Sequence, residues 1–191
     1  VPEEYPFYIL MIDENEIVWY PLRVTYAREM KVKEYLAGKG IESFIPMRYE
    51  QKLRGEEMVK IQVPVVHNFI FVHISKAELK DIKAASLISP FIRYIMNLET
   101  RLPLIVPDKQ MQDFIAVAGS MDEQLMYLSS AEVAMKKGDR VRIIGGIWEG
   151  VEGKFVRIKR GLRVVVEIEG IMAVATASLH PSLVEKIEEG E

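Results

Sequence analysis

Apolar residues occupy both alternating sides of the stretch 69–72. One side carries Phe69, Phe71 and His73, and the other carries aliphatic residues only. A strand at 69–72 would therefore have no polar face, which is typical of a central strand covered on both sides. If helices cover one face, the other face offers two aromatic rings. The residues alone leave open whether those rings are core or contact a partner.

An alternating pattern at 17–24 predicts a second strand, and an amphipathic helix follows it. Thr25 is suited to cap this helix, which begins at about Arg28. Gly38 and Gly40 are expected to end it. One side of the helix is apolar and the other is basic.

A hairpin is expected between this helix and the central strand. Its strands lie at 43–50, where Pro46 interrupts the pattern, and at 58–63. Arg54-Gly55 supplies the tip.

After the central strand, Ser75 and Glu78 have the spacing of a capping box that begins a short helix. A strand at 91–96, a returning segment at 103–106 and a helix from Pro107-Asp108 follow. Strands and helices separated in this way, with hairpins between them, predict an α+β domain on a mainly antiparallel sheet.

From Lys136 onward, five short β runs are separated by glycines. They predict a small β-barrel, and Val164-Val165-Val166 favours strand over helix. The segment before them has weak periodicity and is expected to be a linker. The predicted parts are an N-terminal extension at 1–15, an α+β domain at 16–118, a linker at 119–135 and a barrel domain at 136–191.

The composition changes this picture little, with 49% hydrophobic and 28% charged residues. A net charge of −3 means that any contact with nucleic acid must come from a local patch. The chain has no cysteine, which excludes disulfides and thiolate metal sites and fits a reducing, cytoplasmic compartment. No apolar run approaches the roughly 20 residues of a membrane helix.

Two groups of motifs resemble the NusG family of transcription elongation factors. The first has the order and spacing of that family's N-terminal domain and lies at Trp19-Tyr20, Phe44-Ile45-Pro46-Met47, Arg54-Gly55 and Asn68-Phe69-Ile70-Phe71-Val72. The second resembles its KOW domain and lies at 137–143 and 145–153. The resemblance implies an antiparallel sheet with flanking helices followed by a five-stranded SH3-like barrel. Asn68-Phe69-Ile70-Phe71-Val72 is more similar to the specialised RfaH branch, which has Asn-Tyr at the first two positions, than to general NusG, although Phe69 departs from both. The N-terminal extension and the overall texture of the chain also resemble the UpxY-type antiterminators.

The resemblance also implies a site for the clamp helices of the largest RNA polymerase subunit. The matching positions are Tyr20, Phe69, Phe71, Phe91 and Tyr94. A few aromatic anchors carry most of the energy when a groove receives a helix. Aromatic rings in strands are also ordinary core residues, so both interpretations stay open.

In the RfaH branch, the region after the first strand reads non-template DNA. The matching positions are Thr25, Tyr26, Arg28, Lys31 and Lys39. Their cationic and aromatic groups suit phosphate contact and base stacking. A solvent-exposed helix face would have the same charge pattern.

The turn after the first barrel strand resembles the family's contact with a ribosomal protein or with the termination factor Rho. This implies partner-binding roles for Trp148 and Val151, although Trp148 could instead fold over the barrel mouth. A larger basic set could touch nascent RNA, namely Lys154, Arg157, Lys159, Arg160 and Arg163. Carboxylates at 149, 152, 167 and 169 lie among them in the sequence and dilute this basic footprint.

No pattern indicates catalysis, a metal site or a cofactor. The histidines lack ligand spacing, and His67 and His73 are expected to be hydrogen-bonded structural groups. The prediction is a monomeric, non-enzymatic elongation factor that suppresses pausing or termination at particular operons, such as polysaccharide biosynthesis loci. The alternatives are general NusG acting with Rho and a KOW-type RNA- or ribosome-binding protein.

Overall fold

The computed structural model describes residues 13–85, 88–97 and 100–187. Most of the expected N-terminal extension, residues 1–12, lies outside them. The chain divides into two compact units. The first comprises Val1–Ile45 and Val66–Asp108, and the second comprises Pro46–Val65 and Lys109–Glu191.

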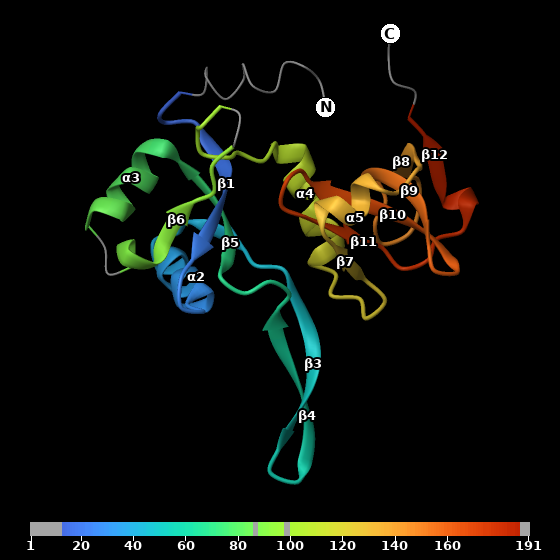
Figure 1. Ribbon diagram of the computed structural model, residues 1–191, viewed down its shortest axis with the longest axis horizontal. Coiled ribbons are helices and arrows are strands. Elements are labelled where there is room, and N and C mark those ends of the chain that lie inside the picture. The colour runs from blue at the N-terminus through green and yellow to red at the C-terminus, as the bar shows by residue number, and fades with distance from the viewer. Residues whose placement is uncertain (1–12, 86–87, 98–99, 188–191) are drawn as a thin grey trace. The chain divides into compact units, whose positions relative to one another are not determined.

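A four-stranded antiparallel sheet forms the first unit, in the order β2-β5-β1-β6. Its strands are β1 (Ile17–Val24), β2 (Glu42–Phe44), β5 (Phe69–Ser75) and β6 (Ile92–Tyr94). The strand predicted to be central is confirmed, because β5 lies between two neighbours and all but one of its residues are buried. Figure 1 shows β1 and β5 side by side.

Helices α2 (Glu29–Gly38) and α3 (Lys76–Ala85) both contact β5, and the 3-10 helix η1 (Ser89–Phe91) leads into β6. The predicted capping box of α3 is confirmed. The Glu78 amide donates to Ser75 Oγ at 3.2 Å, and the Ser75 amide donates to Glu78 Oε2 at 3.3 Å. This reciprocal pair satisfies two backbone donors that the helix leaves free.

The predicted helix cap at Thr25 is wrong, because Arg28 holds the N-cap position of α2 without a side-chain cap. Tyr26 and Ala27 have positive φ angles of 61° and 49°, so the chain makes a turn before the helix begins. Asn68 holds this turn: its Oδ1 accepts from the Ala27 amide at 2.8 Å.

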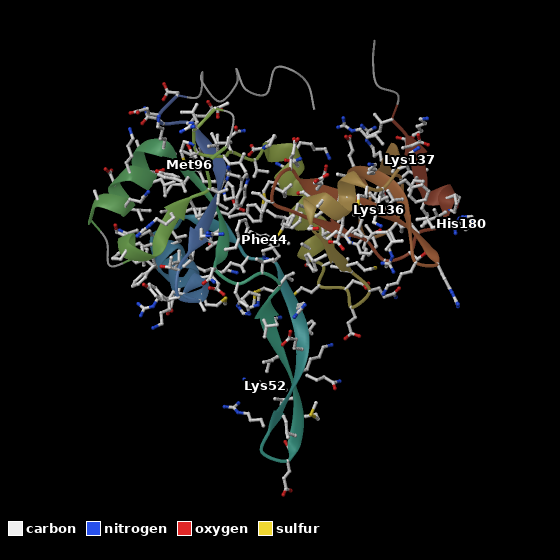
Figure 2. All side chains as sticks on the ribbon, in the orientation of Figure 1. Phe44, Lys52, Met96, Lys136, Lys137 and His180 are labelled. Atoms are coloured by element: carbon white, nitrogen blue, oxygen red, sulfur yellow. The ribbon has the colours of Figure 1, made fainter. Side chains whose placement is uncertain are left out.

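In the second unit, β3 (Met47–Arg54) and β4 (Glu57–Pro64) form a long two-stranded hairpin (Figure 1). Its tip is at Gly55, whose φ of +67° favours glycine. Pro46 separates β2 from β3, as its effect on strand pairing predicts. Figure 2 shows the side chains along the hairpin and labels Lys52 among them.

The rest of the second unit is a six-stranded antiparallel sheet in the order β12-β8-β9-β10-β11-β7. Its strands are β7 (Met126–Leu128), β8 (Asp139–Ile143), β9 (Glu152–Ile158), β10 (Gly161–Ile168), β11 (Met172–Ala175) and β12 (Val184–Lys186). The remaining elements are α4 (Asp108–Ala118), α5 (Ser130–Ala134) and η2 (Pro181–Leu183). The five predicted barrel strands are present as β8 to β12, and the α+β fold class is confirmed.

The sixth strand comes from the segment expected to be a linker. β7 pairs with β11, and Leu128 joins a buried cluster that includes Val133, Val156 and Val165. A capping box at Ser129 and Glu132 begins α5. Part of the segment 119–135 therefore packs with the barrel strands. The domain limits given from the sequence stay a prediction.

Among the helices that the structure describes, none has both the length and the apolar composition needed to cross a membrane.

Candidate functional site

The five rings predicted to bind polymerase do not form one surface. Antiparallel register pairs Tyr20 with Val72 and Leu22 with Tyr94, so Tyr20 and Tyr94 lie on one face of the sheet. Phe69 and Phe71 have the opposite parity in β5 and lie on the other face. Phe91 lies outside the sheet, at the end of η1.

On the face of Phe69 and Phe71, the two rings pack edge to face with centroids 4.7 Å apart. Trp19 lies on the same face and stacks on His73 at 4.6 Å. Exposed fractions of 6% for Phe69, 0% for Phe71 and 4% for Trp19 show that all three rings are buried in this structure. The sequence prediction assigned Tyr20 to the polymerase site and did not include Trp19. The strand register places Trp19 opposite His73, on the face of Phe69 and Phe71.

On the opposite face, Tyr20 and Tyr94 meet edge to face at 6.3 Å. The ammonium group of Lys83, from α3, lies 3.8 Å from the centre of the Tyr94 ring, so α3 covers this face. Burial, with a smaller contribution from Tyr94, raises the pKa of Tyr20 to about 12. These contacts are those of a helix packed on a sheet.

Phe91 belongs instead to a cluster at the start of α2. The Arg28 guanidinium lies 4.2 Å from the centre of the Phe91 ring. The rings of Tyr26 and Phe91 pack edge to face with their centroids 6.4 Å apart. Tyr26 is 80% exposed. An exposed ring beside a stacked guanidinium is suited to a nucleobase and a phosphate.

The other residues predicted to touch nucleic acid extend along α2. Lys31 is exposed, and the ammonium group of Lys39 lies 5.4 Å from the centre of the Tyr35 ring. Positions 31, 35 and 39 are four residues apart, so they follow one side of the helix. Thr25 sits in the preceding turn, where its buried hydroxyl has no hydrogen-bond partner. Apart from Thr25, the predicted set therefore offers three exposed cations and the exposed ring of Tyr26.

The turn between β8 and β9 buries the two residues predicted to bind a partner. Trp148 is 5% exposed and Val151 is 3% exposed, whereas Ile147 between β8 and Trp148 is 76% exposed. The side chain of Lys109 donates to the Gly150 carbonyl at 3.2 Å. Trp148 thus shapes the turn, which presents Ile147 and, at 47% exposed, Ile144.

A separate hollow of about 490 Å³ lies between the β3–β4 hairpin and the segment 121–127. Lys60 and Glu123 form an ion pair across it, and Tyr49 and Tyr127 line it. Burial raises the pKa of Tyr127 to about 12. None of the rings predicted to bind polymerase lines this hollow.

The histidines make hydrogen bonds of the structural kind that was expected for two of them. His67 Nδ1 lies 3.1 Å from Glu29 Oε1, and His73 Nδ1 lies 3.0 Å from Glu42 Oε2. Within residues 13–85, 88–97 and 100–187, no group of three or more histidine and acidic side chains could hold a metal ion.

Of the comparisons with known proteins, a family model agrees with the N-terminal motifs noted in the sequence. A comparison with curated protein sequences gives no match. The chain is similar to a solved structure from a study of domain interaction in Thermotoga maritima NusG, at 23% sequence identity and a TM-score of 0.45. That similarity covers 91% of this chain and 98% of the other. The family model described as "Transcription termination factor nusG" matches residues 17–115, just over half of the chain. The chain therefore belongs to the NusG family of transcription factors.

Proposed function

We propose that the protein is a transcription elongation factor that binds RNA polymerase through its first sheet and suppresses pausing or termination at particular operons. NusG-family transcription factors bind RNA polymerase and are non-enzymatic. The observation that carries the proposal is the family match over residues 17–115, which includes β1, β5 and β6.

The polymerase contact is assigned to the face of Phe69 and Phe71, with Trp19 as a third ring. Aromatic rings in contact with one another provide the large apolar area that anchors a helix. Because these rings are buried here, binding requires that the face become accessible to the clamp helices. Phe91 adds a half-buried ring near Arg28, while Tyr20 and Tyr94 support the sheet from its other side.

The test is a binding and transcription assay with purified core polymerase and the Phe71→Ala variant. We expect Phe71→Ala to lose polymerase binding and pause suppression. A buried phenylalanine truncated to alanine also costs about 3–5 kcal/mol of stability, so stability must be controlled.

The matched control is Leu79→Ala. Leu79 is 1% exposed in α3, on the helix that covers the opposite face, and its truncation also destabilises the sheet. Folded Leu79→Ala should keep polymerase binding. Equal loss in both variants, or undiminished binding by Phe71→Ala, contradicts the assigned face.

The turn between β8 and β9 is proposed to bind a second partner, a ribosomal protein or Rho. Ile147 supplies the exposed apolar contact, and Trp148 and Val151 hold the turn in shape. The tethered barrel then presents its partner at a high effective concentration near the polymerase.

General NusG acting with Rho is the second candidate, favoured by the family description as a termination factor. The two differ in where they act. Restriction to one or a few operons in a genome-wide occupancy map supports the specialised factor. Uniform occupancy of transcribed genes supports the general one.

A further inference from the structure

The turn of the β9–β10 hairpin carries three cations that no carboxylate in the described part of the chain neutralises. Lys159 and Arg160 form the turn, since Ile158 pairs with Gly161, and Arg157 directly precedes this pair. All three side chains are exposed. None forms an ion pair with a residue in the described ranges, in contrast to Arg142, which pairs with Glu152 at 2.8 Å.

A hydroxyl group lies beside this turn. The amide of Leu179 donates to the Leu162 carbonyl at 2.8 Å, which aligns the segment 177–180 with the start of β10. A Cβ atom built on Gly161 would lie 2.7 Å from Ser178 Oγ. We call Arg157, Lys159, Arg160 and the exposed Ser178 the basic tip.

Among the described residues of the barrel, Glu169 lies far from the basic tip, and Asp139 and Glu185 are already paired. Glu169 lies in the turn at the opposite end of β10, an eight-residue strand, so it is roughly 25 Å away. Asp139 lies 3.1 Å from Lys186, and Glu185 lies 3.5 Å from Arg142. The sequence mixes the two signs of charge, but the fold separates them.

We propose that the basic tip binds the phosphodiester backbone of single-stranded nucleic acid. Cations gain affinity for phosphates by releasing condensed counterions, and a serine hydroxyl donates well to a phosphate oxygen. A protein partner would need apolar or aromatic anchors, and the basic tip has none. The exposed apolar side chain of the neighbouring turn, Ile147, lies at the other end of β9.

Backbone contacts of this kind bind both RNA and DNA without reading sequence. Two labelled probes therefore test whether the ligand is RNA or DNA. They are an oligouridylate and an oligothymidylate of about twelve nucleotides, each about one OB-fold site in length. Binding to the full chain is measured by fluorescence anisotropy over a series of salt concentrations. With three phosphate contacts, the logarithm of the association constant should fall with a slope of about −2 against the logarithm of the salt concentration.

The test variant is Lys159→Glu/Arg160→Glu. It should weaken binding roughly tenfold and reduce the slope to about −0.7, because one cation remains. The matched control is Lys52→Glu/Arg54→Glu on the exposed β3–β4 hairpin, which changes the net charge by the same amount. The control should bind as tightly as the unchanged chain.

Equal weakening by both variants would show only general electrostatic attraction and would overturn the proposal. So would unchanged binding by the tip variant, which would place the site elsewhere, for example at Tyr26 and Arg28. Binding of polyglutamate but of neither oligonucleotide would assign the tip to an acidic polypeptide instead.

A second measurement covers the case in which the tip variant fails to fold. Amide resonances of residues 157–162 and of Ser178 in the unchanged chain should shift when oligonucleotide is added, and their constancy would contradict the proposal. Polymerase binding is measured separately, so failure of this inference leaves the proposed function untouched.

Discussion

At the scale of single residues, Asn68 holds together two parts of the first unit. Its φ of 64° lies in the left-handed region, which asparagine tolerates better than most residues. Its side chain accepts from the Ala27 amide, and its carbonyl accepts from the Val24 amide, both at 2.8 Å. The turn before the central strand and the turn before α2 are therefore fixed by one residue, through its side chain and its main-chain carbonyl.

We expect Asn68→Ala to lower the free energy of unfolding by about 2 kcal/mol. About half comes from the left-handed backbone and half from the lost hydrogen bond. Asn68→Asp keeps both an acceptor oxygen and a tolerance for this backbone, and should lose much less. Denaturant unfolding measures the free energy of unfolding of the two variants. Equal losses would show that Asn68 Oδ1 does not stabilise the turn.

The hydroxyl of Tyr20 gives the protein a measurable alkaline response. Because the folded-state pKa is raised from 10.0 to about 12, the folded state opposes ionisation. The contribution of the protonated Tyr20 hydroxyl to the free energy of unfolding is fully present below pH 10. It is lost as the pH rises through 12, and the total loss is about 3 kcal/mol. Tyr20→Phe should lack this loss. The measurement compares the unfolding free energy of both proteins below pH 10 and near pH 12, and parallel curves would disprove the assignment.

At the scale of elements, β7 and α5 extend the barrel beyond the strands that glycine turns reveal. β7 is three residues long, and α5 is five residues long. Their stability comes from packing against β10 and β11 more than from local propensity. This explains why the weak periodicity of 119–135 predicted a linker.

Leu128→Ala should destabilise the second unit by about 2–4 kcal/mol, because it leaves a cavity beside Val133 and Val156. Met135→Ala, at a side chain that is 79% exposed, should change stability by less than about 0.5 kcal/mol. Thermal unfolding followed by circular dichroism compares them. If Leu128→Ala is also neutral, the segment does not stabilise the barrel.

The elements that sequence could predict are those with strong local signals. Alternation identified β1, the uninterrupted apolar run at 69–72 identified β5, the capping box identified α3, and glycine spacing identified β8 to β12. The candidate site was predicted less well, because the face of a side chain depends on strand register. Tyr20 and Trp19 are neighbours in sequence, and only pairing with His73 places Trp19 on the side of Phe71. The separation of the basic tip from the carboxylates of the barrel could not be predicted from the sequence either, because it depends on which strand ends lie side by side.

At the scale of the whole molecule, the proposed function joins two binding surfaces in one chain. We expect Ile147→Glu to abolish capture of the second partner while polymerase binding by the first sheet stays unchanged. The reason is that Ile147 is 76% exposed in its turn, so a charge there blocks an apolar contact without disturbing the fold. Pull-down of polymerase, and of a purified ribosomal protein or Rho, measures the two events separately. Loss of both would contradict independent surfaces.

Trp19 and Trp148 are the two tryptophans of the chain, and each is buried in a different compact unit. Replacing either one with phenylalanine leaves a single tryptophan, whose emission under selective excitation reports on one unit alone. The protein thus contains two native optical probes, with which the opening of the sheet and that of the barrel can be followed separately without any added dye.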